Sequence, residues 1–204
     1  MIDYALTRNR IWSHFNQITP ISKNEFDKIA SLTTIQTLKK GDVVYKQGGI
    51  PAYGGFIIRG ALRYCYTPPM ERRDVTTSFQ FEDTCFGDLR SIFYNEPALT
   101  SLQAIEDTVI ARLNKAHYME LFDSCKPFAR AMVSSLEAKY NELLGDTIER
   151  IDREAEERYM KMLEQYPHIL QRVSQRYIAS YLGIKPQSLS RIRKNIMAKP
   201  SLAA

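Results

Sequence analysis

The chain has 204 residues and a mass of 23.6 kDa, which is enough for one large domain or two small ones. Apolar residues make up 44% and charged residues 25%, values that exclude a disordered or low-complexity chain. The apolar runs are too short to span a bilayer, and the N-terminus has charges where a signal peptide has an apolar region. The three widely spaced cysteines match no disulfide or metal framework. We therefore expect a cytoplasmic protein.

The positive charge of the chain is concentrated near its C-terminus. The net charge is +5, and the segment 172–199 holds seven Lys or Arg and no acidic residue. The preceding 171 residues carry 21 basic and 23 acidic residues. This asymmetry indicates a basic C-terminal module on a nearly neutral body, and it points to a polyanionic partner.

The first segment, 1–30, is expected to be helical, because Ile11, Phe15 and Ile18 recur at helical spacing before a proline. In 31–113, short β-branched and aromatic stretches alternate with turn residues, which predicts an antiparallel barrel or sandwich. The stretch 74–81 alternates regularly. It predicts a strand with one face formed by Val75, Thr77, Phe79 and Phe81 and the other by Thr76, Ser78 and Gln80.

The segment 114–151 changes to a helical period, with a restart at Pro127. An apolar stripe then runs along about six turns of helix. A partner helix across a two-fold axis would bury this stripe, which predicts a homodimer; the alternative is a single helix packed on its own barrel. The predicted dimerisation residues are Met132, Leu136, Tyr140 and Leu143.

The segment 152–204 contains the most informative pattern of the chain. Ser174 can cap a helix, and Gly183 permits the positive φ of a tight turn. Pro186 suits the first turn of a second helix, where its missing N–H costs nothing. The order helix, glycine turn, helix predicts a helix-turn-helix motif.

The second helix of this motif has two distinct faces at 100° per residue. Its buried face is predicted to hold Leu189, Ile192 and Ile196, and the opposite face Gln187, Ser190, Arg191 and Lys194. Arg can pair with guanine and Gln with adenine in a major groove. An ordinary solvated hairpin is the alternative, but the absence of acid over 28 residues favours DNA. Further predicted DNA contacts, mainly to phosphates, are Arg172, Gln175, Arg176, Lys185, Ser188 and Arg193.

The chain resembles the catabolite-activator/FNR (Crp/Fnr) superfamily of bacterial transcription regulators. The resemblance rests on Lys40-Gly41-Asp42, on the stretch 54–60, on Phe86-Gly87-Asp88-Leu89 and on the segment 173–196, in that order. It implies an α+β fold with an N-terminal jelly-roll sensor of the cyclic-nucleotide-binding type, a dimerisation helix and a DNA-binding domain. It also implies base contacts at the positions of Gln187 and Arg191. The chain ends soon after the second helix, so we expect the C-terminal wing to be truncated.

The same resemblance places an effector site at Phe86, Gly87, Asp88, Leu89, Thr100 and Ser101. Members that bind cyclic nucleotides have Gly-Glu-Leu followed by an Arg for the phosphate. Here Asp88 replaces the Glu, and the stretch 96–101 contains no Arg. A buried phosphate without a cation is unfavourable, so we expect that cAMP is not bound in the usual way. The effector would be another small molecule, or the pocket is filled by the protein's own side chains.

Other function classes lack their sequence signals. There is no Cys in 1–64 for an FNR-type iron–sulfur cluster, and no His cluster of the kind that cupin enzymes use. We therefore expect neither an enzyme nor a cofactor. The favoured function is a homodimeric regulator that binds double-stranded DNA, with RNA polymerase as a further candidate partner. The alternative is an effector-binding signalling module that acts through a protein partner.

Overall fold

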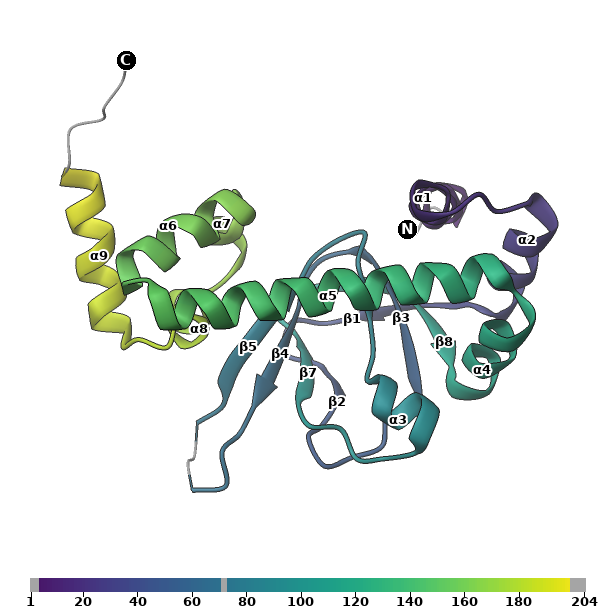
Figure 1. The fold of residues 1–204 in the computed structure, drawn as a ribbon, viewed down its shortest axis with the longest axis horizontal. Helices are drawn as coiled ribbons and strands as arrows, with labels where there is room; N and C mark the ends of the chain where they lie inside the picture. The colour runs from purple at the N-terminus through teal and green to yellow at the C-terminus, as the bar shows by residue number, and fades with distance from the viewer. Residues whose placement is uncertain (1–3, 71–72, 199–204) are drawn as a thin grey trace, which may run out of the picture.

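The computed structural model describes residues 4–70 and 73–198 and has an α+β fold (Figure 1). Helices α1 (Tyr4–Ile18) and α2 (Lys23–Leu32) form the N-terminal segment, as predicted. Ser22 begins α2 with a capping box, in which its side chain accepts from the Glu25 N–H and the Glu25 carboxylate accepts from the Ser22 N–H. No described helix is both long and apolar enough to cross a membrane.

The β domain consists of two antiparallel four-stranded sheets, which we call the β-roll. The first sheet has the strand order β1-β8-β3-β6, and the second has the order β2-β7-β4-β5. The strands are β1 (Thr34–Leu38), β2 (Val43–Tyr45), β3 (Tyr53–Arg59), β4 (Leu62–Tyr66), β5 (Val75–Gln80), β6 (Cys85–Phe86), β7 (Ser101–Ala104) and β8 (Thr108–Asn114).

The interior of the β-roll is apolar. Ile57, Leu62, Leu102 and Ile110 are fully buried in one cluster together with Phe86. They come from strands of both sheets, so the alternation of side chains along each strand builds this core. A short helix, α3 (Leu89–Tyr94), connects β6 to the stretch before β7.

The regular alternation predicted for the stretch 74–81 is wrong in its first half. The pairing of β4 with β5 shifts register between Tyr64 and Cys65, so that Cys65 lies opposite Thr76. Arg63 lies opposite Phe79, and its guanidinium donates to the Thr76 hydroxyl at 3.2 Å. The bulge therefore brings Thr76 to the same face as Phe79.

The helical segment after the β-roll is broken into two helices. Helix α4 (Lys115–Ser124) ends at Cys125, and α5 (Lys126–Asp152) begins with Pro127 in its first turn, which agrees with the expected restart. The first turns of α5 bury Phe128 and Ala131 in a cluster formed with α1, α2 and α4. Beyond these turns, α5 extends along the molecule toward the C-terminal helices (Figure 1).

The last part of the described chain is a set of four helices, which we call the C-terminal unit. They are α6 (Ala155–Gln165), α7 (Ile169–Arg172), α8 (Gln175–Tyr181) and α9 (Pro186–Ala198). The described part of this unit contains no strand, and the predicted truncation of the wing falls on 199–204, outside the described residues.

The C-terminal unit and the β-roll share one apolar cluster. Ala61, Phe79 and Ile105 of the β-roll are buried in the same cluster as Ile178 and Leu189 of α8 and α9. The Phe79 ring lies 5.4 Å from the ring of Tyr181 in α8, measured between centroids. The position of α8 is therefore fixed by the β-roll as well as by its own unit.

The turn between β3 and β4 allows a test of the close packing around Gly60 within the β-roll. Gly60 has φ of +100°, and a Cβ there would lie 2.5 Å from the Thr108 hydroxyl oxygen. Gly41 has a similar φ of +98° but open space around it. We expect Gly41→Ala to lower the free energy of unfolding by about 1–2 kcal/mol, from the positive φ alone. Gly60→Ala should cost about 1–3 kcal/mol more, because the methyl group also overlaps Thr108. Urea titration of both variants checks this; equal losses would contradict it.

Candidate nucleic-acid interface

Helices α8 and α9 are joined by a tight turn built as the sequence predicts. Ser174 is the N-cap of α8, and its hydroxyl accepts from the Tyr177 N–H at 3.4 Å. Gly183 has φ of +69°, a conformation that favours glycine. Helix α9 then begins at Pro186. The ends of the two helices and the turn between them are therefore set by local signals.

The two faces of α9 are also as predicted. Leu189 is fully buried, and Ile192 and Ile196 pack against the same cluster. Gln187, Ser190, Arg191 and Lys194 are all exposed. A single outward face thus presents two cations and side chains that can both donate and accept hydrogen bonds. The chemistry of this face suits an anionic, polar partner.

An open groove of about 480 Å³ lies between the start of α8 and the last turns of α9. Arg193 and Lys194 supply cations to it. Arg193 also interacts with the Tyr159 hydroxyl: burial raises the pKa of Tyr159, and Arg193 opposes this rise. The groove is lined by Gln175, Ser190, Arg193, Lys194 and Met197.

The remaining predicted DNA contacts do not all belong to this face. Arg176 and Lys185 are exposed near it, and Ser188 is partly buried. Arg172 is different, because its guanidinium is engaged by Glu82 and Glu106 of the β-roll. No local signal in the sequence indicates these two partners.

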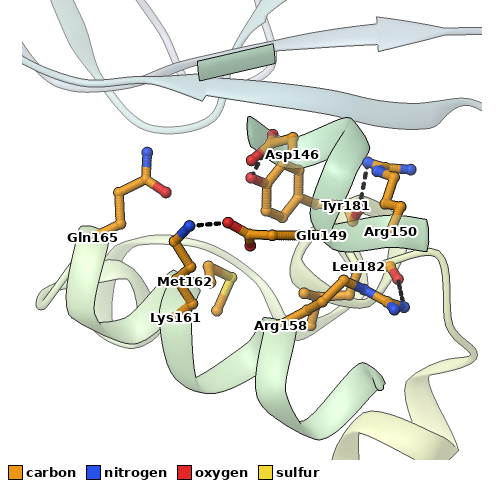
Figure 2. A pocket seen from close by; sticks show the side chains of 9 residues that line it. All are labelled: Asp146, Glu149, Arg150, Arg158, Lys161, Met162, Gln165, Tyr181 and Leu182. Carbon is orange, nitrogen blue, oxygen red and sulfur yellow. Dashed lines mark hydrogen bonds and ion pairs between the residues drawn. The ribbon is translucent and has the colours of Figure 1, made fainter. Parts of the chain in front are cut away.

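Helix α8 contacts the β-roll on one side and the long helix α5 on the other. Between α5, α6 and the end of α8 lies a cavity of about 20 Å³, which is large enough for one water molecule (Figure 2). The Tyr181 hydroxyl donates to Asp146 of α5 at 2.8 Å, and Arg150 of α5 donates to the Tyr181 carbonyl at 2.9 Å. Burial raises the pKa of Tyr181, and Asp146 raises it further. Lys161 of α6 pairs with Glu149 of α5. These contacts hold the C-terminal unit against α5.

The middle of α5 exposes apolar side chains to solvent. Of the predicted dimerisation residues, Leu136, Tyr140 and Leu143 are 53%, 63% and 45% exposed. Met132 is placed differently: it packs into the protein's own cluster and accepts a hydrogen bond from Tyr118 at 2.6 Å. Three further exposed apolar residues on the same helix were not predicted, namely Val133, Leu144 and Ile148.

Comparison with known proteins agrees with this architecture. Residues 35–125 match the family model of the cyclic nucleotide-binding domain. A putative regulator of the crp/fnr family from Eubacterium rectale has 14% identity, covers 92% of this chain and 88% of its own, and gives a TM-score of 0.72. FixK2 from Bradyrhizobium japonicum has 16% identity and a TM-score of 0.71, over 82% of this chain and 85% of its own.

The c-di-GMP responsive regulator CLP from Xanthomonas campestris gives a TM-score of 0.69 at 12% identity, over 87% of this chain and 92% of its own. No curated protein matches the sequence. The chain has the Crp/Fnr fold. This confirms the predicted resemblance and the predicted fold class.

The Crp/Fnr resemblance assigns Phe86, Gly87, Asp88 and Leu89 to an effector site, and we call these four residues the cassette. The cassette makes contacts within the protein. Phe86 is buried in the core of the β-roll. The Gly87 N–H donates to the Tyr64 hydroxyl at 3.1 Å, and that hydroxyl donates to the Gly87 carbonyl at 3.2 Å. Asp88 caps α3 by accepting from the Ser91 N–H at 2.9 Å.

The other predicted effector residues lie on neighbouring elements. The Ser101 hydroxyl accepts from the Gln47 N–H at 2.9 Å, at the start of β7. Leu89 packs against the cluster formed by the N-terminal helices, α4 and the start of α5. Thr100, directly before β7, is partly buried. Ser101 thus ties β7 to the stretch after β2.

These residues do not fit a cyclic nucleotide bound in the usual way. Ala98 lies in the stretch that lacks the phosphate Arg, and it is 2% exposed within the apolar core. Arg63 is the only Lys or Arg that is buried among the described residues, and it faces Asp74 and Gln103 rather than the cassette. Arg90 pairs with Glu96 at the surface. The described residues hold no cluster of three or more His, Cys, Asp or Glu that could bind a metal ion.

Proposed function

We propose that the protein is a homodimeric, sequence-specific DNA-binding transcription regulator. The observation that carries this proposal is the outward face of α9, where Gln187, Arg191 and Lys194 are exposed together. Segment 172–199 contains no acidic residue to repel a phosphate backbone. The Crp/Fnr fold supports the proposal, because the structures that share it include a putative transcriptional regulator.

In this proposal, α9 is the recognition helix of a helix-turn-helix motif. It enters the major groove, where Arg191 can pair with the O6 and N7 atoms of guanine and Gln187 with adenine. Arg176, Lys185, Arg193 and Lys194 neutralise phosphates on either side. Phosphate contacts fix the register of the helix, and the base contacts supply the sequence specificity.

The exposed apolar residues of α5 support the dimer. A second copy of α5 packed along Leu136, Tyr140 and Leu144 would remove them from water. The two C-terminal units would then be related by a two-fold axis, so that two α9 helices would read two half-sites of a palindromic operator.

The β-roll is proposed to act without cAMP bound in the usual way. The Gly87 N–H, which could face a phosphate, is occupied by Tyr64, and the buried Ala98 offers no charge. A different small effector remains compatible with this arrangement. So does an interior that is filled only by the protein's own side chains.

The DNA contact is tested on a duplex selected from random sequences. We expect Arg191→Ala to weaken binding to that duplex by about 1–3 kcal/mol, because the guanine pairing is lost. Lys194→Ala should weaken binding to the selected duplex and to random duplexes equally. It should also reduce the salt slope, which is the slope of the logarithm of the binding constant against the logarithm of the salt concentration, by about 1. Fluorescence anisotropy at several salt concentrations measures both effects.

Lys126→Ala is the control, because it removes one exposed cation at the start of α5, away from α9. It should leave binding unchanged. A Gln187→Ala/Arg191→Ala double variant should bind the selected duplex more weakly than the wild type. If the two bind equally, the proposal is contradicted, and a module that signals through a protein partner is favoured.

The dimer is tested by placing a charge on the exposed face of α5. We expect Leu136→Glu to yield monomers in sedimentation equilibrium, because two carboxylates would face each other in an apolar interface. Leu99→Glu is a matched control, since Leu99 has a similar exposure of 59% but lies in the β-roll. A monomeric wild type, or a dimeric Leu136→Glu variant, would be evidence against the dimer.

The sensor is tested by thermal unfolding with millimolar cAMP. A ligand at 1,000 times its Kd would stabilise the native state by about 4 kcal/mol and raise Tm by several degrees. We expect no rise beyond that given by 5′-AMP at the same concentration. A larger rise with cAMP would show that the cassette binds it despite the missing Arg.

A further inference from the structure

Arg172 connects the C-terminal unit to two carboxylates of the β-roll. Its Nη1 and Nη2 atoms donate to the two carboxylate oxygens of Glu82 at 2.9 and 2.8 Å, a bidentate pair. Its Nε donates to Glu106 at 3.1 Å, and Nη2 also contacts that carboxylate. All three guanidinium nitrogens are therefore engaged. Four of its five N–H groups are used in this way, so only one N–H of Nη1 is left for a phosphate.

Both carboxylates belong to the β-roll, and that of Glu82 is also held there by a backbone N–H. Glu82 follows β5 and accepts from the Gly60 N–H at 2.8 Å, in the turn between β3 and β4. Glu106 lies between β7 and β8. Burial raises the pKa of Glu82, but hydrogen bonds from Arg172 and Gly60 outweigh this and lower it overall. Phe81 lies beneath the guanidinium, 4.9 Å from its central carbon to the ring centroid.

The position of Arg172 in the chain makes this contact important for orientation. Arg172 ends α7, and only Val173 and Ser174 separate it from the first turn of α8. Helix α8 also contacts the β-roll directly: the Thr76 N–H donates to the Ser180 hydroxyl at 2.9 Å, and Tyr177 stacks on Arg63 at 3.9 Å. In this docked arrangement the outward face of α9 stays exposed. Docking therefore leaves the proposed recognition face accessible.

We propose that Arg172 is a positioning residue, which orients the recognition helix by clamping the C-terminal unit to Glu82 and Glu106, and that it does not contact DNA itself. The inference rests on the proposed function. A dimer must present its two recognition helices at a fixed separation, and that separation depends on how each unit sits on its β-roll. The clamp sets this geometry, and it links the loops of the β-roll to α9.

The test compares the two sides of the ion pair. Arg172→Gln should weaken binding to the selected duplex on the order of 5- to 150-fold, the usual range of coupling between sites. Glu82→Gln should weaken it by a smaller factor, because Arg172 keeps its contact with Glu106. The double variant should bind no more weakly than Arg172→Gln alone, because that variant already lacks the contact with Glu82. The salt slope should stay that of the wild type. Glu164→Gln, an exposed carboxylate of α6, is the matched control.

Other results would overturn the clamp. If Arg172 bound a phosphate, Arg172→Gln would reduce the salt slope, and Glu82→Gln would leave binding unchanged or tighten it. Arg172→Lys separates the two roles in a second way. Lysine still serves a phosphate, but it loses the fork that holds Glu82, so the clamp predicts a loss of affinity and a phosphate contact predicts almost none.

Hydrogen exchange gives a readout that does not need DNA. Both clamp variants should speed amide exchange in β5 and α8, including at Thr76, while α1 and α2 keep their wild-type rates. Unchanged exchange in β5 and α8 would reject the clamp. If the wild type fails to bind DNA but the exchange responds as expected, the proposed function fails and the clamp as an orienting contact stands.

Discussion

Helix α8 has to satisfy two surfaces at once, and the relation between the halves of the molecule depends on this. On one side its Tyr181 hydroxyl reaches Asp146 of α5, and on the other the same ring packs on Phe79 of β5. A helix of seven residues has too few turns to be stable alone. Its stability therefore comes from packing between these two surfaces, and a movement of α8 away from either surface must break the contacts on that side.

The parts of the candidate site that could be predicted are those encoded locally. Ser174, Gly183 and Pro186 act through capping, positive φ and a fixed dihedral, so their spacing defines the turn without knowledge of the rest of the chain. The partners of Arg172 could not be predicted, because Glu82 is 90 residues away and Glu106 is 66. Met132 shows the same limit: helical periodicity places it near the apolar stripe, but only the packing of α4 reveals that it faces Tyr118.

In the β-roll, a shift of one residue in strand pairing changes which side chains share a face of β5. One register shift beside Cys65 brings Thr76 onto the face that α8 covers, a change that binary alternation cannot signal. The family resemblance located the effector cassette, but not the hydroxyl of Tyr64 that bonds to both polar groups of the Gly87 backbone. The fold of the β-roll was therefore predictable. The contacts made by the Gly87 backbone were not, because they depend on a side chain that lies outside the motif.

The docking of α8 also protects the sheet. Strand β5 is the last strand of its sheet, so its outer N–H and C=O groups have no neighbouring strand. The Ser180 hydroxyl takes up one of these groups, the Thr76 N–H, and the helix covers the adjoining side chains. An unpaired edge next to apolar residues is a template for strand addition by other chains. A β-roll separated from its C-terminal helices would expose this edge, so the helices that are proposed to read DNA also shield the last strand of the sheet from other chains.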